Sequence, residues 1–228
     1  MKALRWFVLP VTVVLVLAGC KSTVSDTDGG SPTVLRRPVI GFSGASNVHF
    51  EALNVEEQVV LATGTLVASA ARFDPVFLPL AQLPWNVLQP HSPVFFWDDE
   101  DYVCNVTVDP AELRSTGTFM FFQVDGGGVL ALSTFDWLPA MFTGIMPVGS
   151  RFYWFELVDR AAHIEGTCQS VDRPETVQYA LDLAPGWNPV AFVVTAADSD
   201  GIVTSLRLQS ESPVPDAKWY YYGFSFDE

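Results

Sequence analysis

Three histidines are the residues of this 228-residue chain best suited to acid–base chemistry. His49, His91 and His163 could each act as a general base, but no Gly-x-Ser-x-Gly sequence accompanies them to supply a serine nucleophile. A catalytic triad can be assembled from residues far apart in sequence, so the missing motif does not by itself exclude an enzyme. His49 and His163 lie in strand-like runs, where a structural role is the more common one. The residues therefore predict no catalytic site and favour a non-catalytic binding or structural module, with an envelope hydrolase acting on a polymer or peptide as the alternative.

Two short acidic stretches could hold a cation. Asp98-Asp99-Glu100-Asp101 and Asp198-Ser199-Asp200-Gly201 concentrate the carboxylate oxygens that Ca²⁺ prefers, although the second stretch lacks the further ligands of an EF-hand loop. Adjacent residues of a strand point to opposite faces, so the first run does not by itself form the carboxylate pair of a glycosidase. Solvated loops between strands are the favoured interpretation of both stretches, and we expect no metal ion and no cofactor.

The first twenty residues have the composition of an export signal. Lys2 and Arg5 precede an apolar run over residues 6–18, which is too short for a hydrocarbon core that needs about twenty residues. The sequence that follows, Leu17-Ala18-Gly19-Cys20, resembles a bacterial lipobox. The resemblance implies cleavage before Cys20, which would then carry a thioether-linked diacylglycerol and an acylated amino group. A buried cysteine in a transmembrane helix, or an ordinary secretory signal with a chance cysteine, are the alternatives.

The residues after Cys20 predict a tether. Residues 20–38 are rich in small polar residues, glycine and proline, a composition typical of flexible linkers. Lys21 follows Cys20, and by resemblance to the sorting rule of diderm bacteria this favours the outer membrane. The expected organisation is a signal peptide over residues 1–19, a lipidated cysteine and tether over 20–38, and a β-rich domain over 39–228. The membrane is the expected partner through the anchor at Cys20, and no protein or glycan partner is identified.

Composition excludes two classes of protein. The chain has 26 acids against 12 bases, a net charge of −14, which is the wrong sign for a nucleic-acid binder. Removal of residues 1–19 takes away two bases and no acids, so the mature chain would carry −16. Apolar residues make up 49% of the chain and aromatic residues 13%, which is enough for a packed core and excludes a disordered chain.

Cys104 and Cys168 are the two cysteines that the proposed anchor leaves over. In an exported chain two thiols are more often joined than free, because the compartment is oxidising. Two free buried thiols, or a redox or metal pair, are the alternatives, but the chain has no Cys-x-x-Cys and no histidine at a metal-ligand spacing from either cysteine. We therefore predict a disulfide.

The body of the chain predicts strands. From Val39 onward, short alternating or wholly apolar runs are separated by Gly, Pro and Asp, as in β proteins. The expected strands are 48–53, 59–66, 119–124, 129–132, 152–158, 191–195, 202–208 and 219–226, with 152–158 central and the last strand packed into the sheet. A short helix is expected at 109–113, where Asp109 precedes Pro110. The fold class is mainly β, an antiparallel β-sandwich-like domain with one short helix and a possible sub-boundary near the prolines of 75–93.

Tryptophans offer a second possible function. Exposed indoles could stack on sugars or peptides, but most are expected in the core or at its edge. They are Trp85, Trp97, Trp137, Trp154, Trp187 and Trp219. The stretch Tyr179-Ala180-Leu181-Asp182-Leu183-Ala184-Pro185-Gly186-Trp187-Asn188 resembles a pattern in a loose group of uncharacterised bacterial lipoproteins, as do Ala62-Thr63-Gly64-Thr65 and Leu78-Pro79-Leu80. The resemblance supports the location and the β architecture, and Gly186-Trp187-Asn188 is expected to form a turn whose ring covers the end of the core.

Overall fold

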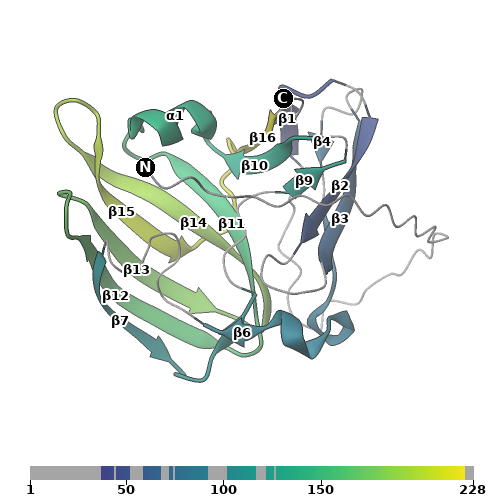
Figure 1. Ribbon diagram of the computed structural model, residues 1–228, viewed down its shortest axis with the longest axis horizontal. Coiled ribbons are helices and arrows are strands. Elements are labelled where there is room, and N and C mark those ends of the chain that lie inside the picture. The colour runs from purple at the N-terminus through teal and green to yellow at the C-terminus, as the bar shows by residue number, and fades with distance from the viewer. Residues whose placement is uncertain are drawn as a thin grey trace.

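The fold is mainly β and sandwich-like, as the sequence predicts, with a single short helix among the residues that the structure describes. Figure 1 shows the computed structural model. It describes residues 37–43, 45–51, 59–67, 72–73, 75–91, 102–116, 122–125 and 127–223.

The strands before the short helix are two to eight residues long, and those after it are five to twelve residues long. The first group is β1 (Arg37–Ile40), β2 (Ala45–Glu51), β3 (Val60–Val67), β4 (Arg72–Phe73), β5 (Val76–Phe77), β6 (Gln89–Pro90), β7 (Tyr102–Asp109), β8 (Arg114–Ser115), β9 (Phe122–Val124) and β10 (Val129–Ser133). The second group is β11 (Arg151–Val158), β12 (Ala162–Ser170), β13 (Thr176–Leu183), β14 (Gly186–Ala197), β15 (Val203–Ser210) and β16 (Lys218–Tyr222). Two 3₁₀ turns, η2 (Leu80–Gln82) and η3 (Trp85–Val87), lie in the proline-rich middle, and the helix is α1 (Trp137–Thr143).

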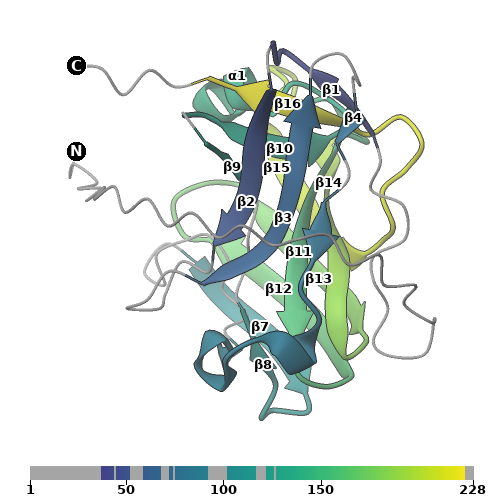
Figure 2. The same cartoon turned by 90° about the vertical axis from the view of Figure 1, so that its right-hand side faces the viewer.

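One continuous sheet folds back on itself to form the layers. Its strand order is β16-β1-β4-β3-β2-β9-β10-β11-β14-β15-β13-β12-β7. Figure 2 shows β2 and β3 in front of the layer that contains β11 to β14. Most pairings are antiparallel, and β1 with β16 and β13 with β15 are the parallel pairs among the described strands.

β11 separates two apolar cores because both of its faces are buried. Tyr153 and Phe155 belong to the first core, which β3, β9, β10 and β16 share. Phe152 and Trp154 point the other way, into the second core, which is enclosed by the curve of β14, β15, β13, β12 and β7. This confirms the prediction of a central strand at 152–158 and places it where both cores depend on it.

Of the strands that enclose the second core, β14 also packs against the first core, whereas β12 is polar on its outer face. β12 alternates buried and exposed residues, with Ile164 and Cys168 inside and His163 and Glu165 outside. Position 166 of β12 is a glycine because the neighbouring strand β7 passes too close to leave room for a side chain. A Cβ at this position would lie 2.1 Å from the carbonyl oxygen of Asn105, and the φ angle of +141° also favours glycine.

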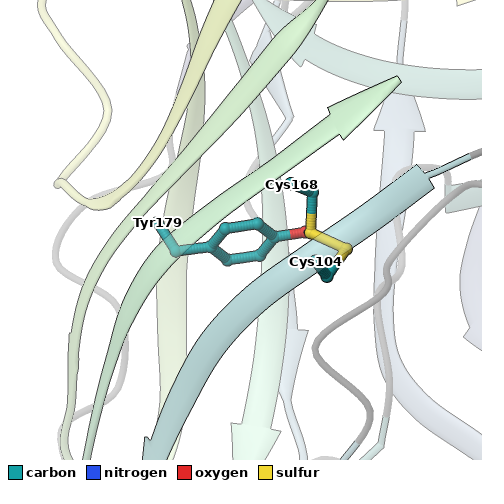
Figure 3. The surroundings of a disulfide bond; sticks show 3 residues. All are labelled: Cys104, Cys168 and Tyr179. Atoms are coloured by element: carbon teal, nitrogen blue, oxygen red, sulfur yellow. A yellow bond between two sulfur atoms is a disulfide. The ribbon is translucent and has the colours of Figure 1, made fainter. Parts of the chain in front are cut away.

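A disulfide joins Cys104 of β7 to Cys168 of β12, as the sequence predicts. The two residues face each other in the register of the two strands, with 4.0 Å between their Cα atoms. The Tyr179 hydroxyl lies 3.9 Å from the Cys168 Sγ (Figure 3). Because a disulfide sulfur carries no hydrogen, the hydroxyl is the donor in this weak contact.

Four of the predicted strands pair as two hairpins and the predicted C-terminal strand is confirmed, whereas residues 119–121 of the strand expected at 119–124 lie outside the described residues. β9 pairs with β10 across the Gly-rich turn, and β14 pairs with β15 across the turn at 198–201. β16 pairs with both β1 and β10 and buries Trp219 completely. The part of the expected strand beyond residue 223 lies outside the described residues.

The helix predicted at 109–113 is wrong. Asp109 is the last residue of β7 and pairs with His163 of β12, so its backbone is extended. The chain then turns, with the Leu113 N–H donating to the Pro110 carbonyl at 3.1 Å, and enters β8. The structure places the helix instead at α1, whose sequence is WLPAMFT. Because almost all of these residues are apolar, the sequence shows no alternation of polar and apolar faces from which a helix could be predicted.

Gly186-Trp187-Asn188 begins β14 and is not the predicted turn. The Asn188 side chain reaches back to the preceding turn, where its Nδ2 donates to the carbonyls of Ala184 and Gly186 at 2.8 and 2.9 Å. The Trp187 ring is buried in the first core, as expected, and its Nε1 donates to the Leu78 carbonyl at 2.8 Å.

Candidate functional site

A cavity of about 600 Å³ opens into the second core at one end of the curved sheet. Its walls come from four separate parts of the chain: α1 and the segment after it, β11, the turn between β12 and β13, and the β14–β15 hairpin. The lining residues are Trp137, Gly144, Met146, Phe152, Trp154, Arg173, Pro174, Glu175, Phe192, Asp198, Ile202, Val203, Thr204 and Leu206. No single stretch of sequence signals such a site.

The floor of the cavity is aromatic because strand alternation directs the large side chains inward. Phe152 and Trp154 leave β11 on the second-core face, and Phe192 leaves the neighbouring strand β14 on the same face. The Trp154 and Phe192 rings are 6.0 Å apart, and the Trp137 and Phe152 rings are 4.9 Å apart. Phe192 is partly exposed to the cavity, whereas Phe152 and Trp154 are 2% and 0% exposed and close it from below, so an apolar group of a ligand would contact chiefly Phe192.

Hydrogen bonds to the body hold both ends of α1. The Tyr222 hydroxyl accepts from the Trp137 N–H at 2.9 Å and donates to Asp136 Oδ1 at 3.1 Å. Burial raises the pKa of Tyr222, so the hydroxyl keeps its proton at neutral pH. At the other end, the Gly144 carbonyl accepts from the Val203 N–H at 3.1 Å. The helix is therefore a fixed wall of the cavity.

The turn between β12 and β13 brings charged groups to the cavity. Glu175 is buried, and one of its oxygens accepts a hydrogen bond from the Tyr102 hydroxyl at 2.9 Å. Burial and this contact with Glu175 raise the pKa of Tyr102, so the phenol stays a donor at neutral pH. Arg173 lies two residues away and also lines the cavity, so a cation and a carboxylate can meet the polar end of a ligand.

Asp198, the third charged residue of the cavity lining, is occupied by its own turn. Its Oδ1 accepts from the N–H groups of Asp200 and Ile202, both at 2.9 Å. The second acidic stretch is therefore a turn closed by an aspartate side chain. Within the described residues, no group of three or more His, Cys, Asp or Glu side chains could hold a metal ion. The first acidic stretch, 98–101, lies outside the described residues.

His91 lies in a buried cluster that sequence reasoning missed. Its Nδ1 is 3.1 Å from the Ser115 Oγ and 3.0 Å from the Glu156 Oε1, and the side chains of His91 and Glu156 are 2% and 0% exposed. A catalytic triad needs the serine and the carboxylate on different ring nitrogens, and here both face the same one. The cluster is also not part of the cavity lining. The sequence does offer one indication of this cluster: Glu156 is the single acid within the apolar run 152–158, and a buried acid needs a polar partner.

Of the other two histidines, only His163 has a described side chain, and it does not join this cluster. His163 is exposed on the outer face of β12, where its Nδ1 is 2.7 Å from Asp182 Oδ1 and its Nε2 is 3.5 Å from Glu165 Oε2. The hydrogen bond to Asp182, followed by that to Glu165, raises the pKa of His163. His49 lies in β2, as predicted, and its side chain is outside the described residues.

The tryptophans divide between the cores and the cavity. Trp137, Trp154, Trp187 and Trp219 are all buried, which confirms the expectation for these four. Trp137 and Trp154 also border the cavity, but they are 7% and 0% exposed, so they do not form the exposed aromatic platform considered from the sequence. Trp97 and the side chain of Trp85 lie outside the described residues.

Comparison with known proteins finds no match, and the described residues do not meet the requirements of a membrane-spanning helix either. Among the described residues no helix is long and apolar enough to cross a bilayer. No protein-family model, no curated protein and no solved structure matches this chain.

Proposed function

We propose that this protein is a lipid-anchored binding module of the bacterial cell envelope that holds an apolar or amphiphilic molecule in its cavity. In a diderm bacterium the anchor at Cys20, followed by Lys21, favours the outer membrane. The observation that carries the binding role is the cavity at the open end of the second core. We propose a non-catalytic role because the apolar and charged side chains that line the cavity are suited to binding a ligand.

The size and lining of the cavity support a small amphiphile as the ligand. Sites for small molecules measure about 300–1,000 Å³ and combine apolar walls with a few polar groups. Here Met146, Phe192 and Val203, which are only partly buried, would take the apolar part of the molecule. Arg173 and Glu175 would face its polar end.

The chemistry of the lining argues against the envelope hydrolase. The lining residues include no His, Ser or Cys that could serve as base or nucleophile. The two lining carboxylates already have partners, since Glu175 accepts from Tyr102 and Asp198 closes its own turn. The Ser115–His91–Glu156 cluster is not part of the lining and uses one ring nitrogen for both contacts.

A substitution that fills the cavity tests the binding role. Thr204→Trp adds an indole to a half-buried lining position without removing a core side chain. We expect it to weaken binding of the fluorescent amphiphile 1-anilinonaphthalene-8-sulfonate at least tenfold, roughly 1.4 kcal/mol, because the added ring occupies the ligand's volume. Titration followed by energy transfer from the tryptophans to the probe measures the dissociation constant.

The matched control is Thr107→Trp, the same change on the exposed outer face of β7. It should bind the probe as the wild type does, with an unchanged thermal midpoint in both variants. Equal affinity for the probe in the wild type, Thr204→Trp and Thr107→Trp would show that the cavity is not the binding site.

Acylation of Cys20 tests the anchor. In cells of a diderm bacterium fed an alkyne-bearing palmitate, the wild-type protein should take up the label and sediment with membranes, because three acyl chains hold it there. Cys20→Ala should lose the label, whereas Ser22→Ala, two residues away, should keep it. A wild-type protein without label, or a labelled Cys20→Ala protein, would rule out lipidation at Cys20.

A further inference from the structure

The mouth of the cavity carries an exposed apolar surface that neither core explains. Phe142, Ile145, Val148 and Ile202 are 81%, 50%, 61% and 46% exposed. These four residues are called the apolar rim below. Ile145 and Ile202 form a β-bridge with each other, and Ile202 also lines the cavity, so the rim continues into the cavity wall. Contiguous exposed apolar residues of this kind mark interaction sites.

The rim is a fixed surface. Gly144 closes α1 with a φ of +69° and accepts a hydrogen bond from Val203, which ties the end of the helix to β15. The Gly149 N–H donates to the Val194 carbonyl at 2.8 Å, and this holds the far end of the segment to β14. The backbone on both sides of Ile145 and Val148 is therefore held in place with these side chains outward.

Charge selects a neutral lipid surface as the partner. Residues 137–150, which carry three of the four rim residues, contain no charged side chain, although 17% of the chain is charged and its net charge is −14. The charged neighbours of the fourth, Ile202, are the exposed carboxylates Asp198 and Asp200 of its turn, which would be repelled by anionic lipids. An uncharged apolar edge can enter the headgroup region of a bilayer, where comparable surfaces lie about 5–10 Å deep. The acidic remainder of the protein would stay in water and be repelled by anionic lipids.

The position of the tether permits this contact. β1 begins at Arg37 and pairs with β16, and both strands lie at the same end of the molecule as α1 in Figures 1 and 2. The chain between Cys20 and Arg37 reaches at most about 60 Å when fully extended. An acylated Cys20 would therefore keep the end of the molecule that carries the rim within reach of the bilayer.

We propose that the apolar rim docks onto the lipid bilayer, with the mouth of the cavity against the membrane, so that an amphiphile passes between bilayer and cavity without crossing water. The proposal rests on the proposed anchor and ligand cavity and adds the source of the ligand, which is the membrane itself. Arg173, which is exposed and lines the cavity, would then face the headgroups.

A label on the rim tests the docking. In Phe142→Cys the new cysteine is the only free thiol, because Cys104 and Cys168 form a disulfide and Cys20 is acylated. The full lipidated protein, labelled there with a nitrobenzoxadiazole dye, is placed on phosphatidylcholine vesicles that contain a nitroxide-bearing lipid. The control is Val76→Cys, a 65% exposed aliphatic residue of β5 that belongs to neither cavity nor rim.

We expect the nitroxide lipid to quench the dye at position 142 at least about threefold more than the dye at position 76, and iodide in the water to do the reverse. Adding Ile145→Asp and Val148→Asp should abolish the difference, and vesicles rich in anionic lipid should reduce it. Equal quenching at both positions by both quenchers would overturn the docking.

The two proposals fail separately. Binding of anilinonaphthalene sulfonate is measured without vesicles, so a rim that stays in water while the probe still binds refutes docking alone. A rim that enters the bilayer in a protein that binds no amphiphile supports docking and refutes the cavity ligand.

Discussion

Replacing Cys104 and Cys168 together by alanine is expected to lower the free energy of unfolding by about 4 kcal/mol, because the disulfide closes a loop between residues 64 apart in sequence. The bond also joins β7, the last strand of the sheet, to β12. Without it, the unfolded chain regains the freedom of that loop, and β7 depends on backbone pairing and on its inward side chains alone. Urea unfolding followed by tryptophan fluorescence measures the difference.

The control for this change is Val103→Ala, which shortens an exposed side chain on the same strand. It should alter the free energy of unfolding by less than about 0.5 kcal/mol. Reduction of the wild-type protein under native conditions should move its unfolding midpoint to that of the double variant. Identical midpoints for the oxidised wild type and the double variant would mean that the disulfide does not stabilise this fold.

Breaking the buried pair of His91 and Glu156 is the second large effect that we expect. His91→Leu should lower the free energy of unfolding by about 3 kcal/mol, because it leaves the Glu156 carboxyl inside the core without its partner. Neither carboxyl oxygen of Glu156 has a hydrogen bond of good geometry among the described residues, so apart from the 3.0 Å approach of His91 Nδ1 to Oε1 no contact compensates for burial of the carboxyl. Guanidinium unfolding at neutral pH measures the loss.

A second substitution makes this prediction specific. Adding Glu156→Met to His91→Leu should recover a large part of the lost free energy, because an apolar side chain of similar volume removes the unpaired carboxyl. Both variants should bind anilinonaphthalene sulfonate as the wild type does, since neither residue lines the cavity. A double variant that is less stable than His91→Leu alone would show that Glu156 has a favourable partner other than His91. Loss of probe binding with an intact fold would connect the cluster to the cavity.

Local sequence patterns predict the strands well and one helix badly. Residues 152–158 are apolar at nearly every position, and only a strand buried on both faces requires that, so β11 could be predicted as central. The turn at 198–201 could be predicted because glycine and aspartate favour turns whatever surrounds them. The prediction of a helix at 109–113 is wrong because the backbone pairing of Asp109 with His163 of β12 outweighs the helix-starting pattern of an aspartate before a proline. α1 escaped prediction because almost all of its residues are apolar.

The functional residues were harder to predict than the strands. His91 was singled out only as one of three histidines, and its partners Ser115 and Glu156 follow it by 24 and 65 positions in the chain. Arg173 and Glu175 attract no notice in the sequence, because a charged residue in a turn is ordinary. Their importance comes from facing an aromatic floor that belongs to other strands.

The sequence by itself determined the fold class, the disulfide pairing and the burial of four tryptophans, because alternation, turn residues and the count of cysteines are local or compositional properties. The export signal and the tether are predictions of the same kind, which the acylation experiment addresses. Only the tertiary structure decided where chemistry can occur. The cavity, the buried pair of His91 and Glu156 and the apolar rim each bring together residues from distant segments, and the curvature of one sheet sets those distances. His91 is buried beside Glu156, His163 is exposed on β12, and the side chain of His49 lies outside the described residues. The site proposed here is built instead from residues of α1, β11, the β12–β13 turn and the β14–β15 hairpin, which only the tertiary structure brings together.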